Sequence, residues 1–326
     1  MLYPEFIKKN QVVGICAPSA GVGRKLDRFI ESNKVLRSKG YKIKETASVR
    51  RNNVRSTSDK KRAKELHELF LDKKVKSIIC AAGGDFMLEM MPYVDFDIIK
   101  NNPKWIAGMS DPTNILYTIT TKLDIATLYG FNGSGFTFDK NPCQDVFFEY
   151  FKGNLVKQKS YKKYQNMIDM INEEEIYHDV KWISKDNDLE ISGRLIGGCL
   201  ECIRQLIGTK LDYTNEFINR YKDDGIVWYF DIFDMSSYNF YLTLLQFKNA
   251  GWFDNCKGVL IGRVGFPKVE DKKLDYIKAA DKVLKNIPHI MEMDIGHSDP
   301  SMILINGAII NAKYKDGKGS ISFKLK

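Results

Sequence analysis

Ser110 stands where the chain would expose a nucleophilic side chain. It follows the apolar run 105–108 (WIAG) and precedes Asp111-Pro112, so a short buried strand ends in a tight polar turn. Pro112 fixes its own φ and has no N–H, which suits the first turn of a helix. A hydroxyl on such a turn can face a substrate while neighbouring N–H groups receive negative charge. The alternative is a simple helix cap, and Pro112 stands where the motif G-x-S-x-G has its last glycine.

A serine nucleophile needs a general base, and the chain has four histidines. His297 has the most suitable context, because it follows an apolar run and a glycine, whereas we expect His67 and His178 to be solvated. An imidazole base needs a carboxylate that fixes its tautomer. Asp231 ends the apolar run 226–231 (IVWYFD), where an acid without a partner is costly. Asp234 is the alternative acid.

The glycine pair Gly83-Gly84 follows another apolar run, 75–82, and precedes Asp85. Glycines let the backbone approach a substrate closely. We therefore expect the N–H groups of Gly84 and Asp111 to form an oxyanion hole, and Gly83 and Asp85 to contact the substrate.

The elements that position these residues alternate between strand and helix in the first half of the chain. Such alternation predicts a parallel sheet with helices on both faces and a site at the carboxyl ends of the strands. We expect a flavodoxin-like sheet here. The expected strands are 11–17, 41–46, 75–82, 105–108 and 125–129, and the expected helices are 26–39, 59–71 and 113–121.

A second, smaller α/β domain of the swivelling type is expected in the C-terminal part, with some antiparallel strands. Asn306-Gly307 and Asp316-Gly317 are typical hairpin turns between the last strands. The segment from about 143 to 170 has a helical pattern. The expected organisation is residues 1–137 as a nucleophile domain, 138–191 as a connection with a loop over the cleft, and 192–326 as the domain that carries the acid and His297. The expected C-terminal strands are 193–198, 226–231, 258–263, 287–293, 302–305, 308–314 and 320–324, and the helices are 235–250 and 271–284.

Composition narrows the possible partners. The net charge is +9, but acidic residues are scattered among the basic ones and no nucleic-acid motif accompanies them, so we expect no nucleic-acid partner. No apolar run approaches the length of a membrane span, and the six cysteines stand mostly in apolar surroundings, which indicates a cytoplasmic protein. The loop after the first strand, 18–23, has only part of a dinucleotide-binding glycine pattern, and Cys199 and Cys202 have no second ligand pair. We therefore expect neither cofactor nor metal.

Four blocks of sequence resemble the LD-carboxypeptidase family of serine peptidases, which includes the microcin C immunity carboxypeptidases. They occur in the family's order over nearly the whole chain: VVGICAPS, GGDFMLEMMPYVDFDIIKNNPKWIAGMSD, GRLIGGCLECIRQLIGT and DIGHSDPSMILINGA. The resemblance implies a Ser-Glu-His triad at the interface of two domains. Ser110 and His297 match the nucleophile and the base, whereas Asp231 stands where the family has a glutamate. Met109 replaces the tyrosine that is usual before the nucleophile.

The resemblance also implies the substrate class. Family members cut an amide at an L–D junction in muropeptides, or release the aminoacyl-nucleotide part of processed microcin C. The Gly-Gly-Cys-Leu-Glu sequence that ends at Glu201, the long connection and the chain length are more similar to the microcin-immunity branch. In that branch a loop aromatic residue stacks on the nucleotide base, so Trp182 is a candidate substrate contact. Glu201, from the Gly-Gly-Cys-Leu-Glu sequence, is a second candidate. Family members are often dimers, which implies a homodimer.

We therefore expect a metal-independent serine carboxypeptidase or amidase that acts on a small peptide or an aminoacyl nucleotide. An LD-carboxypeptidase that trims muropeptides is the alternative within the family. A general α/β-hydrolase esterase would use the same residue types, but G-x-S-x-G is missing. A non-catalytic binding protein on the same scaffold is the alternative from a different class. The aspartate at position 231, in place of the family's glutamate, would then reflect the loss of activity.

Overall fold

The computed structural model describes residues 1–326, which form two compact units. Unit 1 comprises Met1–Val156 with Ile303–Asn306, and unit 2 comprises Lys157–Met302 with Gly307–Lys326. The two units are of nearly equal size, and residues 138–191 contribute to both of them instead of forming a separate connection. None of the helices combines the length and apolarity needed to cross a membrane.

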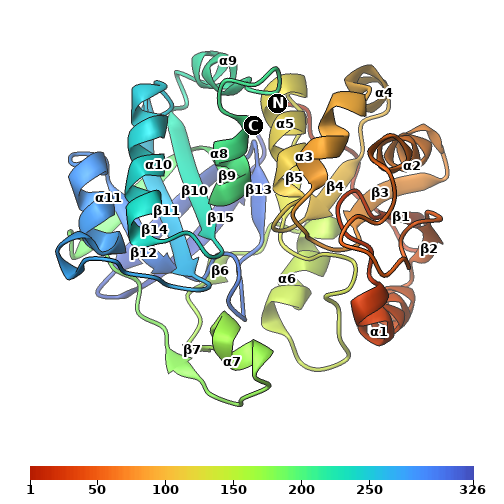
Figure 1. Ribbon diagram of the computed structural model, residues 1–326, viewed down its shortest axis with the longest axis horizontal. Coiled ribbons are helices and arrows are strands. Elements are labelled where there is room, and N and C mark those ends of the chain that lie inside the picture. The colour runs from red at the N-terminus through yellow and green to blue at the C-terminus, as the bar shows by residue number, and fades with distance from the viewer. The chain divides into compact units, whose positions relative to one another are not determined.

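Unit 1 is a six-stranded sheet whose five N-terminal strands are parallel. Its order, β13-β5-β4-β3-β1-β2, contains the flavodoxin-like order 2-1-3-4-5, so the expected fold is confirmed. Helices α2, α4 and α5 lie on one side of the sheet, and α1 and α6 lie on the other (Figure 1). The elements are β1 (Val12–Cys16), η1 (Gly23–Lys25), α1 (Leu26–Ser38), β2 (Lys42–Glu45), α2 (Asp59–Leu71), β3 (Val75–Cys80), α3 (Met87–Met90), η2 (Met91–Tyr93), α4 (Phe96–Asn101), β4 (Trp105–Gly108), α5 (Thr113–Leu123), β5 (Thr127–Tyr129), α6 (Pro142–Phe151) and β13 (Leu304–Asn306).

Unit 2 is built on a mixed seven-stranded sheet of order β12-β11-β10-β9-β14-β15-β6. Strands β9 to β12 are parallel, and β14, β15 and β6 are antiparallel, as expected for a mixed C-terminal domain. The elements are β6 (Gln158–Lys159), β7 (Lys163–Tyr164), α7 (Met167–Ile171), β8 (His178–Asp179), β9 (Asp188–Cys199), α8 (Leu200–Leu206), α9 (Thr214–Arg220), β10 (Ile226–Ile232), α10 (Ser237–Asn249), β11 (Cys256–Val264), η3 (Lys272–Leu274), α11 (Tyr276–Leu284), β12 (His289–Met293), β14 (Ile309–Lys315) and β15 (Lys318–Lys324).

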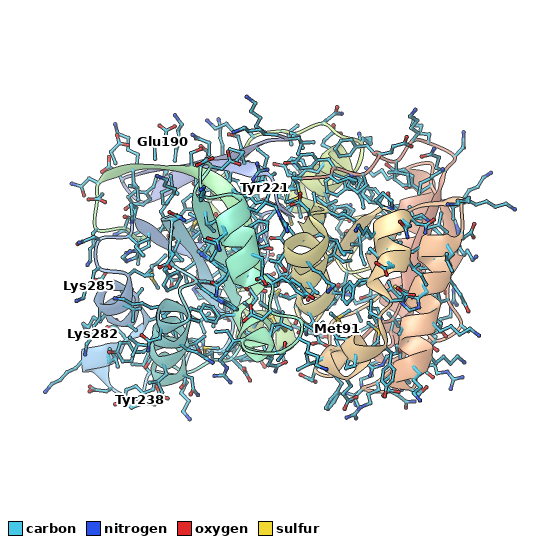
Figure 2. All side chains as sticks on the ribbon, turned by 90° about the horizontal axis from the view of Figure 1, so that it is seen from above. Met91, Glu190, Tyr221, Tyr238, Lys282 and Lys285 are labelled. Carbon is cyan, nitrogen blue, oxygen red and sulfur yellow. The ribbon has the colours of Figure 1, made fainter.

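Burial follows the sequence pattern in the central strands of unit 2. All seven residues of β10 are buried, as is typical of a parallel strand with both faces covered. Helices α10 and α11 run side by side next to this part of the sheet (Figure 1). Tyr238 of α10 and Lys282 of α11 project outward at the surface (Figure 2). Side-chain caps from Ser236 and Asp275 fix where the two helices begin.

Two sequence-based expectations about this fold are wrong. The helix expected from about 143 to 170 ends at Phe151, and short strands β6 and β7 and helix α7 follow it. Asn306-Gly307 does not join a hairpin, because β13 pairs with β5 in unit 1 whereas β14 pairs with β9 in unit 2. Asp316-Gly317 does join the antiparallel strands β14 and β15, as expected.

Candidate active site

Ser110 occupies the turn between β4 and α5 in a left-handed backbone conformation, with φ +70°. Its carbonyl accepts the N–H of Thr113 at 2.8 Å, so the turn passes directly into the helix. A left-handed conformation costs a residue with a side chain about 1–2 kcal/mol. Strain of this kind concentrates at functional sites, and a sharp strand-to-helix turn is how hydrolases expose a nucleophilic serine.

Two side chains that the sequence did not single out hold this turn. The hydroxyl of Tyr129 accepts the N–H of Ser110 at 3.0 Å. The amide of Asn132 accepts the N–H of Met109 at 3.0 Å and donates to its carbonyl at 3.1 Å. Tyr129 ends β5, the neighbour of β4, and this adjacency of strand ends was the only signal for it.

The glycine pair after β3 lies against Ser110, as expected from the carboxyl ends of neighbouring parallel strands. A Cβ on Gly83 would lie 3.1 Å from the Cβ of Ser110 and 3.4 Å from its Oγ. Gly84 has φ +150°, and a Cβ there would lie 2.3 Å from the Oγ of Ser19. A larger residue at Gly83 would therefore crowd Ser110, and one at Gly84 would crowd the loop after β1. Asp85, the expected substrate contact, is exposed.

The carboxylate of Asp111 is part of the scaffold of this turn. It is 3% exposed and accepts hydrogen bonds from the Ser19 hydroxyl, the Met87 N–H at 2.8 Å and the Asn114 amide at 3.0 Å. Burial raises the pKa of Asp111, although the bonds from Ser19 and Met87 oppose the increase. These contacts tie the loops after β1 and β3 to the turn that carries the serine.

Unit 2 contains a buried histidine–carboxylate pair. His297 Nδ1 lies 2.9 Å from Asp231 Oδ1, and the His297 backbone N–H donates to the same oxygen at 3.2 Å. Asp231 is fully buried and His297 nearly so. A carboxylate at Nδ1 holds the proton of neutral imidazole on that nitrogen, which leaves Nε2 as the basic atom. Burial lowers the pKa of His297, but the charge and hydrogen bond of Asp231 outweigh it, so the pKa is raised overall.

Gly296 makes this pair possible. It has φ +89°, and a Cβ at this position would lie 1.8 Å from Asp231 Oδ1. The backbone therefore passes so close to the carboxylate that only glycine fits before His297. Phe233 also contacts the imidazole, with 4.7 Å between ring centroids.

Of the two candidate acids, Asp231 is the one in contact with His297, whereas Asp234 is exposed. Glu201, expected to bind substrate, instead holds the loop after β10. Its Oε1 accepts the backbone N–H groups of residues 233–235 at 3.0–3.1 Å, and its Oε2 accepts the thiol of Cys199 at 3.2 Å. Burial raises the pKa of Glu201. The oxygens of this side chain are engaged within the protein.

Trp182 lies in the core of unit 2 and is 0% exposed. Its indole N–H donates to Asp294 Oδ2 at 3.0 Å. A fully buried ring offers no face to a nucleotide base, so the structure corrects the expectation that Trp182 stacks on a ligand. Its position in an aromatic-containing loop was the only signal behind that expectation.

Comparisons with known proteins agree with the resemblance found in the sequence. The LD-carboxypeptidase N-terminal domain matches residues 13–130, and the LD-carboxypeptidase C-terminal domain matches residues 192–311. A candidate carboxypeptidase of Treponema pallidum (strain Nichols) is 28% identical over 78% of this chain and 75% of its own length. The microcin C7 self-immunity protein of Escherichia coli is 24% identical over 91% of this chain and 88% of its own length. A probable murein peptide carboxypeptidase of Bacillus subtilis (strain 168) is 24% identical over 94% of this chain and 89% of its own length.

Solved structures share the fold over the whole chain. A microcin-immunity-like protein from Bacillus anthracis str. Ames has a TM-score of 0.84 at 22% identity and covers 100% of both chains. The microcin C7 self-immunity protein in complex with aspartyl sulfamoyl adenosine has a TM-score of 0.83 at 21% identity, also over 100% of both chains. With both domain models matched in order and the two-domain fold shared, the chain belongs to the LD-carboxypeptidase family of peptidases, a family of hydrolases.

Proposed function

We propose that the protein is a serine-type carboxypeptidase or amidase in which Ser110 is the nucleophile, His297 the general base and Asp231 the residue that positions the base. Family membership supports the reaction class. The observation that carries the proposal is the buried bond between His297 Nδ1 and Asp231 Oδ1, 2.9 Å long. This bond fixes the tautomer that a serine nucleophile requires.

The reaction would proceed through an acyl-enzyme. Ser110 Oγ attacks the scissile carbonyl carbon and transfers its proton to Nε2 of His297, and the carbonyl oxygen becomes an oxyanion. The N–H groups of Gly84 and Asp111 stabilise that oxyanion. His297 then returns the proton to the leaving nitrogen, the C–N bond breaks, and a water molecule activated by His297 hydrolyses the ester. The mechanism requires the serine and imidazole to come within hydrogen-bond reach, about 2.6–3.2 Å.

The preferred substrate is an aminoacyl nucleotide, as in microcin immunity, and the alternative is a muropeptide with an L–D junction. A microcin self-immunity protein and a probable murein peptide carboxypeptidase each match most of this chain. The family resemblance further supports a cytoplasmic homodimer, for which light scattering after size-exclusion chromatography is the test. A hydrolysis panel of aspartyl sulfamoyl adenosine against an LD-linked tetrapeptide separates the two substrates.

A fluorophosphonate probe tests the nucleophile itself. Wild type should be labelled on one serine, Ser110→Ala should be neither labelled nor active, and Ser58→Ala, at an exposed serine, should behave as wild type. Labelling that survives in Ser110→Ala refutes the assignment. Absence of labelling in wild type, together with retained ligand binding, favours the non-catalytic binding protein.

A further inference from the structure

Unit 2 holds a cavity of about 180 Å³ beside His297. Its lining includes Tyr164, Arg263, Glu292 and Ser298, which come from β7, β11, β12 and the segment after β12. Pockets for drug-sized ligands measure about 300–1,000 Å³. This cavity is smaller and suits one amino-acid-sized group next to the imidazole.

Arg263 brings an unused hydrogen-bond donor to this cavity. Its side chain is 4% exposed, Nη1 donates to Asp294 Oδ1 at 2.8 Å, and the guanidinium stacks over Tyr164 at 4.0 Å from the ring centroid. Nη2 is buried and has no hydrogen-bond partner in the protein. Buried donors are nearly always paired in native structures, so a group without a partner calls for a ligand or another explanation.

Ser298 and Glu292 add a second donor and an acceptor to the same lining. The Ser298 hydroxyl is buried and, like Nη2 of Arg263, has no partner in the protein. Glu292 has a left-handed backbone, φ +56°, which places a charged side chain at the cavity at a conformational cost. Burial raises the pKa of Glu292, and the nearby positive charge of Arg263 opposes the increase.

The charges decide which ligand fits. Asp294 already neutralises Arg263, so a purely anionic ligand would face the carboxylate of Glu292 without compensation. A purely cationic ligand would leave Arg263 Nη2 and the Ser298 hydroxyl without an acceptor. A group that carries both a carboxylate and an ammonium satisfies all three side chains.

We propose that this cavity binds the zwitterionic amino-acid portion of the substrate, with its carboxylate on Arg263 and Ser298 and its ammonium on Glu292. The inference rests on the proposed function, because it places this portion of the substrate beside the general base. Two substrates supply the same chemistry. An aspartyl nucleotide has an α-ammonium and a side-chain carboxylate, and a diaminopimelate-containing tetrapeptide has both groups at the end of a side chain.

Calorimetry in a Ser110→Ala background measures binding without turnover. Aspartyl sulfamoyl adenosine is compared with its N-acetylated form, which lacks the ammonium, and with asparaginyl sulfamoyl adenosine, which lacks the carboxylate. In the second arm, an LD-linked tetrapeptide with diaminopimelate is compared with one with lysine, which lacks the carboxylate. Each missing group should raise Kd at least about tenfold in the arm that contains the natural ligand.

Variants of the cavity residues show which residue binds the ammonium and which binds the carboxylate. In Glu292→Gln, N-acetylation should raise Kd by less than about threefold. In Arg263→Lys, loss of the carboxylate should likewise raise Kd by less than about threefold. Arg263→Lys keeps the charge opposite Asp294, and Ser298→Ala serves as the second test if Arg263→Lys does not fold. Exposed control substitutions, Glu216→Gln and Arg204→Lys, should leave both penalties unchanged.

The outcomes separate this inference from the proposed function. The inference is overturned if removal of the ammonium or the carboxylate raises Kd as much in the cavity variants as in the parent protein. It is also overturned if neither removal raises Kd in either arm, or if no ligand binds in either arm. The nucleophile is judged independently by fluorophosphonate labelling of the protein with Ser110 intact, because that probe carries no zwitterionic group. Normal labelling with unchanged penalties therefore refutes the cavity assignment alone.

Discussion

Replacement of Gly296 by alanine should disable catalysis through a single added methyl group. The new Cβ would lie 1.8 Å from Asp231 Oδ1, whereas such contacts essentially never fall below 3.0 Å. The two atoms must therefore separate by at least about 1.2 Å, a distance set by van der Waals contact. If the carboxylate moves, its 2.9 Å bond to His297 lengthens to as much as about 4 Å, beyond hydrogen-bond reach.

Loss of this bond removes the group that fixes the tautomer of His297 and stabilises the imidazolium. We expect kcat to fall by about 10²–10⁴, because a 1 Å misplacement costs on the order of 10² and loss of the correct tautomer about 10⁴ in a serine protease. KM should change little. Stopped assays with aspartyl sulfamoyl adenosine and the LD-linked tetrapeptide measure kcat, and the rate of fluorophosphonate labelling reports the activation of Ser110 without reference to the substrate.

Gly208→Ala is the matched control for the backbone conformation. Gly208 also has a positive φ, +69°, but a Cβ there meets nothing within 4 Å. Both alanine variants carry the left-handed penalty of about 1–2 kcal/mol, and only Gly296→Ala disturbs the carboxylate. Thermal unfolding verifies that both variants are folded. Should Gly296→Ala retain kcat within about twofold of Gly208→Ala, the role of the Asp231–His297 bond in catalysis is refuted.

Four further predictions follow from the same geometry. Ser110→Gly should be inactive like Ser110→Ala but more stable by about 1 kcal/mol, since glycine relieves the strain at φ +70°; equal Tm values for the two variants would contradict this. Asp231→Asn should shift the acid limb of kcat/KM to lower pH, because Asp231 is what raises the pKa of His297 and the base must be neutral; an unmoved limb would exclude His297 as the base. In wild type the stability from the raised pKa is present below pH 6.5 and is lost as pH rises through the folded pKa, which urea titrations across pH should show. Tyr129→Phe removes the acceptor of the Ser110 N–H and should lower kcat about tenfold with little effect on KM, and the exposed control Tyr238→Phe should have no effect.

Local sequence patterns predicted those elements whose periodicity is strong. The helix expected over 59–71 and the strand over 105–108 have those bounds in the structure, as α2 and β4. Strand and helix alternation also predicted the parallel sheet and, with it, the contact between the Gly83 loop and Ser110. In each case the information lies within a few residues of the chain and in the rule that the strands' carboxyl ends share one edge.

The error at Asn306-Gly307 concerns a contact between residues far apart in the sequence. A turn signal at Asn306-Gly307 predicted a hairpin, but the three residues of β13 pair with β5, about 180 positions earlier. His67 and His178 are partly exposed, and each has one partner that the sequence does not predict. His67 Nε2 accepts the N–H of Asp95 at 2.9 Å, and His178 Nε2 lies 2.7 Å from Asp169 Oδ2. Neither pairing leaves a pattern in the local sequence.

The aspartate at position 231 and the glycine at position 296 are best understood together. The family that this chain resembles has a glutamate at the acid position. Aspartate is shorter by one methylene, so on an unchanged backbone its carboxylate would not reach the imidazole. In this structure the backbone of the histidine segment lies against the acid, because a Cβ on Gly296 would lie 1.8 Å from Asp231 Oδ1. The same oxygen accepts the backbone N–H of His297 and lies 2.9 Å from its Nδ1. The aspartate therefore reaches the imidazole although it is one methylene shorter than glutamate, so the altered acid does not by itself indicate a site that has lost its chemistry.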